Sequence, residues 1–93
     1  MLLFNLGQTV MTRGVANLFN EDRVFRKFVN ESFMKYCEAD WGETCEEDKE
    51  LNDQALKSGD RILAVYKKEG FETIWIITEW DRSATTILFP SEY

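Results

Sequence analysis

Histidine is absent from the 93 residues of this chain. Its absence removes the commonest general base, the usual partner of a catalytic serine or cysteine, and most catalytic metal sites. The glycines stand in isolated turns rather than in a loop that could cradle phosphate. Carboxylate pairs such as Asp40 with Glu43, or Asp48 with Asp53, are the catalytic groups that remain, but acids packed this densely are normally solvated surface residues. We therefore expect a protein that is not an enzyme.

Long apolar runs are also absent, since no segment approaches the roughly 18 consecutive apolar residues of a membrane span. The segment from Met1 to Phe4 has no basic start, no long apolar stretch and no small-residue cleavage site, so we expect no signal peptide. These features predict a cytoplasmic protein. In that compartment Cys37 and Cys45 would normally be reduced thiols.

Apolar and aromatic residues are plentiful enough for one core, and 93 residues predict a single domain over 1–93. The stretch 73–80 is rich in isoleucine and tryptophan and predicts a strand that is buried on both faces for part of its length. A turn at 81–83 leads to a second strand at 84–89, which Pro90 ends. An earlier strand at 61–68 joins through a turn at Glu69–Gly70, so the C-terminal half reads as a three-stranded antiparallel meander.

The N-terminal half predicts one strand and two helices. The strand covers 3–11, with a bulge at Gly7, and 15–19 could add one or two helical turns. Apolar residues at helical spacing predict a helix over 21–37 with Asn20 as its N-cap. Thr44 with Glu47 forms the pattern of a capping box, and Gly59 ends the second helix. The predicted fold class is α+β, with both helices packed on one face of the antiparallel sheet.

Acidic residues are concentrated in one block, where eight acids stand against a single lysine, Lys49. The block carries a net charge of −7, so the rest of the chain is nearly neutral. Direct binding of nucleic acid is disfavoured, and a basic protein surface is the expected partner. Trp41 within the block is either an exposed anchor for that partner or a plug that fixes the loop to the core. The acids are Glu38, Asp40, Glu43, Glu46, Glu47, Asp48, Glu50 and Asp53.

The two cysteines could contribute to a metal site. Cys37 ends the first predicted helix and Cys45 begins the second, so the loop between them could bring both sulfurs together. Zinc accepts thiolate and carboxylate ligands, which makes Asp40, Glu43 and Asp48 candidates to complete the site. Two cysteines without histidine are not a specific zinc pattern, and two free thiols or a disulfide are the alternatives.

Three phrases of the sequence, 11–15 (MTRGV), 40–43 (DWGE) and 74–93 (IWIITEWDRSATTILFPSEY), occur together. Over nearly the whole chain they resemble a family of small accessory proteins carried by plasmids and phages of Gram-positive bacteria. That family looks to include type II-A anti-CRISPR proteins. The family does not require Cys37, which argues against a shared metal site.

The resemblance implies a non-enzymatic inhibitor that binds a guide-loaded Cas nuclease and blocks the loading of target DNA. The eight acids and Trp41 would form its partner-binding surface, because such a nuclease holds its heteroduplex in a positively charged channel. The alternative is another phage or plasmid protein, either anti-restriction or regulatory, that acts on a basic partner and could carry a structural zinc. The plain interpretation of the same acids is a solvated helix face.

Overall fold

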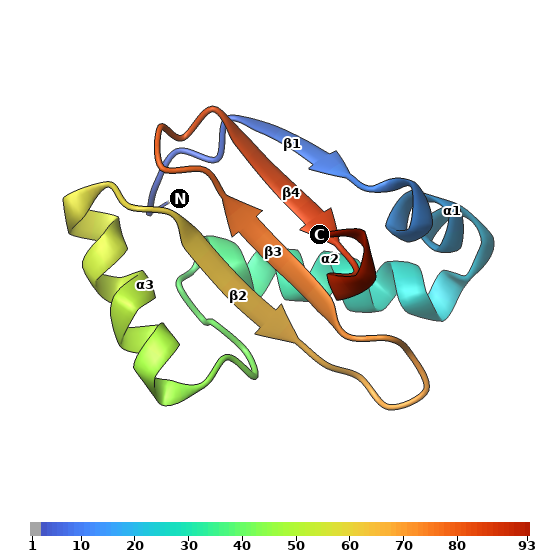
Figure 1. Ribbon diagram of the computed structural model, residues 1–93. Helices are drawn as coiled ribbons and strands as arrows, with labels where there is room; N and C mark the ends of the chain where they lie inside the picture. The colour runs from blue at the N-terminus through green and yellow to red at the C-terminus, as the bar shows by residue number, and fades with distance from the viewer. Residues whose placement is uncertain (1–2) are drawn as a thin grey trace.

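The computed structural model describes residues 3–93, so Met1 and Leu2, on which the signal-peptide expectation partly depends, lie outside the described residues. The four strands form one sheet, and helix α2 crosses behind it (Figure 1). In chain order the elements are β1 (Gln8–Met11), α1 (Arg13–Glu21), α2 (Arg23–Cys37), α3 (Glu46–Ser58), β2 (Ile62–Tyr66), β3 (Ile74–Thr78), β4 (Ala84–Leu88) and the 3₁₀ turn η1 (Pro90–Glu92).

The α+β class is confirmed, but the sheet is mixed rather than antiparallel. Strands β2, β3 and β4 form the expected antiparallel meander. Strand β1 adds to the edge of β4 in parallel, with Gln8 opposite Ala84 and Met11 opposite Ile87. The order β1-β4-β3-β2 brings the first strand beside the last one. The first strand begins only at Gln8, because Gly7 with φ 63° turns the chain before it, so the predicted bulge is a turn instead.

The helix predicted over 21–37 is confirmed as α2, with a later start at Arg23, and a separate helix α1 precedes it. Residues 15–19 extend into α1, and Asn20, the predicted N-cap, lies inside that helix. The break falls at Asp22, whose backbone is extended at φ −122°. Its Oδ1 atom accepts hydrogen bonds from the backbone N–H groups of Val24 (2.9 Å) and Phe25 (3.0 Å). Asp22 is therefore the N-cap of α2, a position that aspartate favours as strongly as asparagine does.

The predicted capping box of α3 is wrong, whereas its predicted end is correct. Cys45 occupies the N-cap position without a side-chain hydrogen bond. Thr44 is instead buried beside β2, where its hydroxyl donates to the carbonyl of Trp41 and accepts from the backbone N–H of Val65 at 2.8 Å. A contact across the fold thus uses the hydroxyl that a local cap would need. Gly59 ends the helix in the left-handed conformation with φ 83°, as expected.

The core lies between the sheet and α2. On this inner face of β2 and β3 the side chains of Ile62, Ala64, Ile74 and Ile76 are completely buried. Alternate residues of the same strands point to the opposite face, as the two-residue period of a strand requires. The inner face therefore holds most of the hydrophobic core.

A chain of hydroxyl groups crosses this core and joins α2, β3, β4 and the N-terminal segment. The Thr85 hydroxyl donates to the carbonyl of Leu6 at 2.7 Å. It must therefore accept from the Thr78 hydroxyl at 2.8 Å, which in turn accepts from the Tyr36 hydroxyl at 2.6 Å. Because each buried hydroxyl has a partner, these polar groups can be buried without a large cost.

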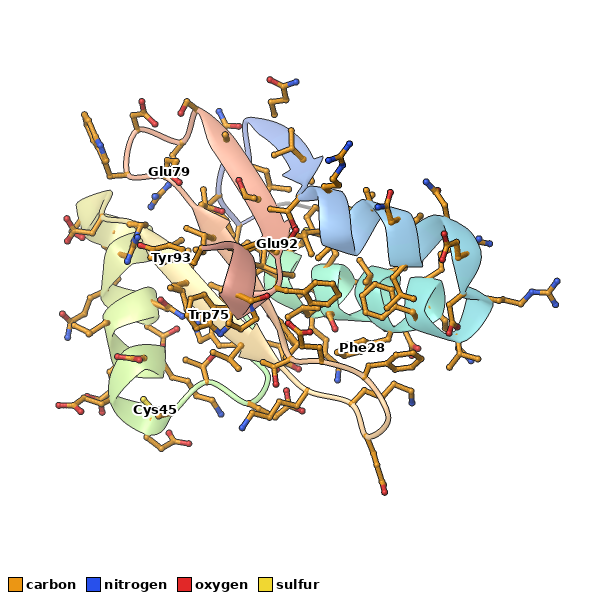
Figure 2. All side chains as sticks on the ribbon, turned by 45° about the vertical axis from the view of Figure 1, so that its right-hand side comes forward. Phe28, Cys45, Trp75, Glu79, Glu92 and Tyr93 are labelled. Atoms are coloured by element: carbon orange, nitrogen blue, oxygen red, sulfur yellow. The ribbon has the colours of Figure 1, made fainter. Side chains whose placement is uncertain are left out.

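The outer face of the sheet is covered much less completely. The C-terminal turn η1 folds back over it and places Tyr93 against Trp75, with ring centroids 5.6 Å apart (Figure 2). Trp75 is only half-buried, while Ile77 beside it on the same face is buried. The expectation of a strand covered on both faces for part of its length is met at Ile76 and Ile77. Trp75 is not part of the inner core, because its side chain lies on the outer face.

Candidate functional site

The acidic block is divided between helix α3 and the loop before it. Helix α3 is fixed to the sheet along one side only. Asn52 bonds to the backbone of Leu63 through both its amide nitrogen (2.9 Å) and its oxygen (3.3 Å), and Ala55 is buried behind it. Most other side chains of the helix are exposed. In Figure 1 the helix accordingly stands outside the edge of the sheet, beside β2.

Three acids of the block bind groups of the protein itself. Asp40 accepts from the backbone N–H of Gly42 at 3.1 Å. Glu43 accepts from the backbone N–H of Lys67 at 3.1 Å. Asp53 accepts from the indole of Trp41 at 2.9 Å. These carboxylates fix the loop between α2 and α3 within itself, to the end of β2 and to α3, which is a structural role that the sequence pattern did not reveal.

Gly42 explains why this loop can lie so close to β2. Its φ is 61°, and it forms an isolated bridge with Val65. A Cβ atom at this position would lie 2.5 Å from the ring of Tyr66. Only glycine combines this backbone conformation with so close an approach.

Five acids of the block remain for a partner. They have no hydrogen bond within residues 3–93, and the one ion pair described there joins Glu46 to Lys49 at 3.6 Å. Three of them lie in the first turn of α3, where the helix dipole favours negative charge. All five are exposed. They are Glu38, Glu46, Glu47, Asp48 and Glu50.

Trp41 is part of the core. Its side chain is 3% exposed and packs with the rings of Tyr36 (5.5 Å) and Phe4 (6.3 Å between centroids). Of the two alternatives for Trp41, an exposed anchor or a buried residue that fixes the loop to the core, the structure shows the second. Trp41 therefore offers no apolar surface to a partner in this conformation.

The predicted metal site is not assembled. Among residues 3–93, no group of three or more cysteine and acid side chains is placed to hold a metal ion. Cys37 is half-buried and packs against the core, where burial raises the pKa of its thiol. Cys45 is exposed at the start of α3, and Asp40 is bonded within its own loop. The predicted set of Cys37, Cys45, Asp40 and Asp48 is therefore not brought together among residues 3–93.

The candidate carboxylate pairs for catalysis are also engaged elsewhere. Asp40 and Glu43 each accept a backbone N–H, as described above. Asp48 and Asp53 are five residues apart on α3, which places them about 140° apart around the helix. Of the carboxylates considered for catalysis, Asp40 and Glu43 therefore bond to backbone groups, whereas Asp48 and Asp53 point in different directions from α3.

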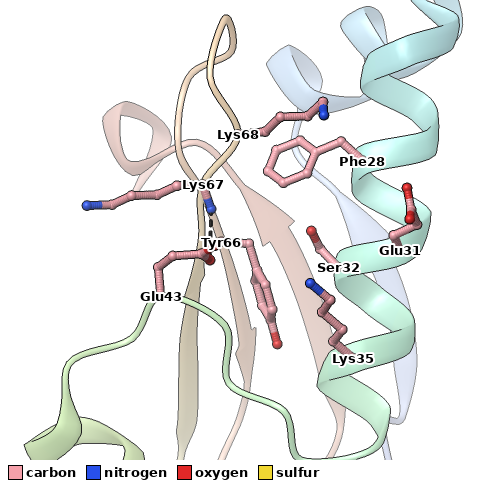
Figure 3. Close-up of a pocket in the computed structure, with 8 residues that line it drawn as sticks. All are labelled: Phe28, Glu31, Ser32, Lys35, Glu43, Tyr66, Lys67 and Lys68. Carbon is pink, nitrogen blue, oxygen red and sulfur yellow. Dashed lines mark hydrogen bonds between the residues drawn. The ribbon is translucent and has the colours of Figure 1, made fainter.

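Beside Glu43 a hollow of about 190 Å³ opens between α2 and β2 (Figure 3). Acids and bases alternate around it, and the Glu43 carboxylate on its wall is held by the backbone of Lys67. Its wall thus has no concentration of charge of one sign. The lining residues are Phe28, Glu31, Ser32, Lys35, Glu43, Tyr66, Lys67 and Lys68.

The first and last phrases that carry the family resemblance meet in space. Glu92 accepts from the Thr12 hydroxyl at 2.6 Å and from the backbone N–H of Gly14 at 2.8 Å. The bond from Thr12, followed by that from Gly14, lowers the pKa of the Glu92 carboxyl. The carboxylate thus caps helix α1 from the other end of the chain, since the Thr12 side chain makes no cap of its own.

Arg82 fastens the β3–β4 turn to the end of α3. The carboxylates of Glu79 and Asp81 are close to it in the sequence. Its guanidinium instead donates to backbone carbonyls, those of Ala55 at 2.8 Å, Asp60 at 2.7 Å and Glu79 at 3.2 Å. The Ala55 carbonyl also accepts from the backbone N–H of Gly59, so Arg82 adds a second donor at the end of α3. The contacts of Glu92 and Arg82 thus join segments of the fold that are far apart in the sequence.

Comparison of the chain with protein-family models, curated proteins and solved structures found no match. None of the helices between residues 3 and 93 has the length and apolar character needed to span a bilayer.

Proposed function

We propose that this protein is a non-enzymatic inhibitor that binds a basic protein surface through the exposed acids of α3 and the adjoining loop. The observation that carries the proposal is the set of five solvated carboxylates on and beside a helix that is held along one side only. Helix α3 can therefore approach another molecule without disturbing the core. Charge of one sign on such a surface speeds association with a partner of opposite charge.

The target that we propose is a guide-loaded type II-A Cas nuclease in the bacterial cytoplasm. Its positively charged channel for the guide–target duplex is the kind of surface that an acidic helix can occupy. Occupation of that surface would prevent target DNA from loading. The target rests on the family resemblance, whereas the chemistry of the partner rests on the charge of α3.

The decisive experiment measures target-DNA binding by a guide-loaded type II-A Cas nuclease, with and without this protein added first. The proposal predicts that DNA binding is lost and that inhibition weakens as salt rises, because exposed charges are screened. Intact DNA binding with lost cleavage would keep an inhibitor but move its action to a later conformational step. Intact binding and intact cleavage would reject the nuclease as target, and a restriction enzyme would be assayed next.

Charge reversal tests which surface acts. The triple variant Glu46→Lys, Glu47→Lys and Glu50→Lys should abolish inhibition and leave the circular dichroism spectrum unchanged. The matched control reverses three exposed acids outside the block, Glu21, Glu31 and Glu69, so that the net charge changes equally. Full inhibition by the α3 triple variant would reject the electrostatic surface, as would equal loss in the control.

A further inference from the structure

A second hollow of about 190 Å³ lies between α3 and β2, on the outer side of the sheet. Leu51 of α3 and Leu63 of β2 form its apolar part. Leu51 is 56% exposed although it is one of the few large apolar residues of α3. Asp48, Asn52 and Arg61 complete the lining.

Two of the three polar groups in this hollow are already used by the protein. The Asn52 amide binds the backbone of Leu63. Arg61 donates to the hydroxyl of Tyr93 at 2.7 Å, and its guanidinium lies 5.9 Å from the centre of that ring. The Asp48 carboxylate has no such bond within residues 3–93. The hollow therefore offers a partner an apolar wall and one carboxylate, beside an Arg61 guanidinium that is turned to Tyr93 but keeps its charge.

Further negative charge stands beside Leu51 on the helix. Asp48 and Glu47 precede it by three and four residues, which are the positions that neighbour it on the helix surface. Val24 on α2 is the opposite case, because it is 55% exposed but shares its hollow with three bases and one acid, which are Arg23, Lys27, Lys68 and Glu31. Equally exposed apolar residues thus lie in acidic surroundings on α3 and in mainly basic surroundings on α2.

We propose that the hollow between α3 and β2 seats a lysine or arginine side chain of the basic partner. The aliphatic stem would lie on Leu51 and Leu63, and the charged end would meet Asp48. Lysine and arginine bury their stems on apolar surface while their charged ends stay with polar groups, so this combination fits them. The inference rests on the proposed function and names the part of the surface that confers specificity.

The first test compares Leu51→Ser with Val24→Ser in binding to the guide-loaded Cas nuclease. We expect Leu51→Ser to bind about tenfold more weakly, because a contact at the centre of an interface carries much of its energy. Val24→Ser should bind as the parent does. Equal affinity of both variants, with binding still lost in the α3 triple variant, would overturn the inference and leave the proposed function intact.

If the parent protein does not bind the nuclease at all, the proposed function fails and the hollow is tested directly. N-acetylarginine amide is titrated while the methyl signals of Leu51 and Leu63 are followed by NMR, with N-acetylcitrulline amide as the uncharged probe of similar shape. Saturable shifts at both leucines with the arginine probe alone would support the site. Shifts that are absent, or equal with both probes, would overturn it.

Discussion

The inner and outer faces of the sheet differ in what covers them. Inner residues such as Ile74 and Ile76 are fully enclosed by α2 and the aromatic side chains around it. On the outer face Trp75 is half-buried beneath Tyr93, which is itself 69% exposed. Both faces are built from the same strands, so the difference arises from the elements that pack on them. Stability should depend mainly on the inner face, and outer residues can be changed with less risk to folding.

The largest effect should come from a substitution on the inner side. Phe25 is fully buried among the rings of Phe28, Phe71 and Phe89. Phe25→Ala should lower the free energy of unfolding by about 3–5 kcal/mol, a large part of the total for a small domain. Trp75→Ala on the outer face should cost about 1–2 kcal/mol, because less apolar area leaves water there. Urea unfolding measures both, and a Trp75→Ala loss as large as that of Phe25→Ala would refute the difference between the faces.

A smaller effect is expected from the hydroxyl chain that crosses the inner face. Tyr36→Phe removes the bond to Thr78 and should cost about 0.5–1.5 kcal/mol at neutral pH. Burial raises the pKa of Tyr36 in the folded protein above its usual value of 10.0. An unfolded chain would therefore lose this proton first, so the stability due to Tyr36 is present below pH 10 and falls as the pH rises further.

Unfolding in urea at neutral pH and above pH 10 should show a smaller alkaline loss in Tyr36→Phe than in the parent. The remaining loss in the variant would include Tyr66, whose pKa is also raised by burial. An equal alkaline loss in parent and variant would contradict the burial of a neutral Tyr36 hydroxyl.

The smallest effect on stability is expected at the C-terminus, where Glu92 bonds to Thr12 and Gly14. The bonds from Thr12 and Gly14 lower the pKa of Glu92 in the folded protein below its usual 4.5. The stability that this carboxylate contributes is therefore present above pH 4.5 and is lost as the pH falls through its folded pKa. Glu92→Gln should melt at a lower temperature than the parent at neutral pH, and the difference should shrink in acid.

Melting temperatures of the parent and of Glu92→Gln across this acid range test the contribution of the Glu92 bonds to Thr12 and Gly14. The pKa of Asp81 is also lowered, by its bonds with Ser83, and this contribution is common to both proteins. A difference between parent and Glu92→Gln that does not depend on pH would show that the ionised form of Glu92 does not hold α1.

Most helices and strands could be predicted because their signals are local. The apolar spacing of 24–36 and the turn at Gly59 depend on neighbouring residues, and the structure has both features. The predicted cap at Asn20 failed because Asn20 lies inside α1, and the predicted cap at Thr44 failed because that residue bonds across the fold. Asp22 had the extended backbone that a cap needs, and the Thr44 hydroxyl was taken by β2.

The candidate surface was predicted only in outline. The concentration of acids was evident from the sequence, but which of them are free was not. Asp40, Glu43 and Asp53 look like Glu47 and Glu50 in the sequence, yet the first three hold the loop.

The sequence by itself determined the α+β class, the three-stranded meander and the acidic character of one region, because these follow from composition and from short-range periodicity. Tertiary structure alone decided that β1 joins β4 in parallel, that Trp41 is buried and that Cys37 and Cys45 are not grouped with the acids of the block among residues 3–93. It also placed Leu51 opposite Leu63. Each of these outcomes depends on contacts between residues far apart in the chain, and local propensity does not encode how separate elements pack against one another.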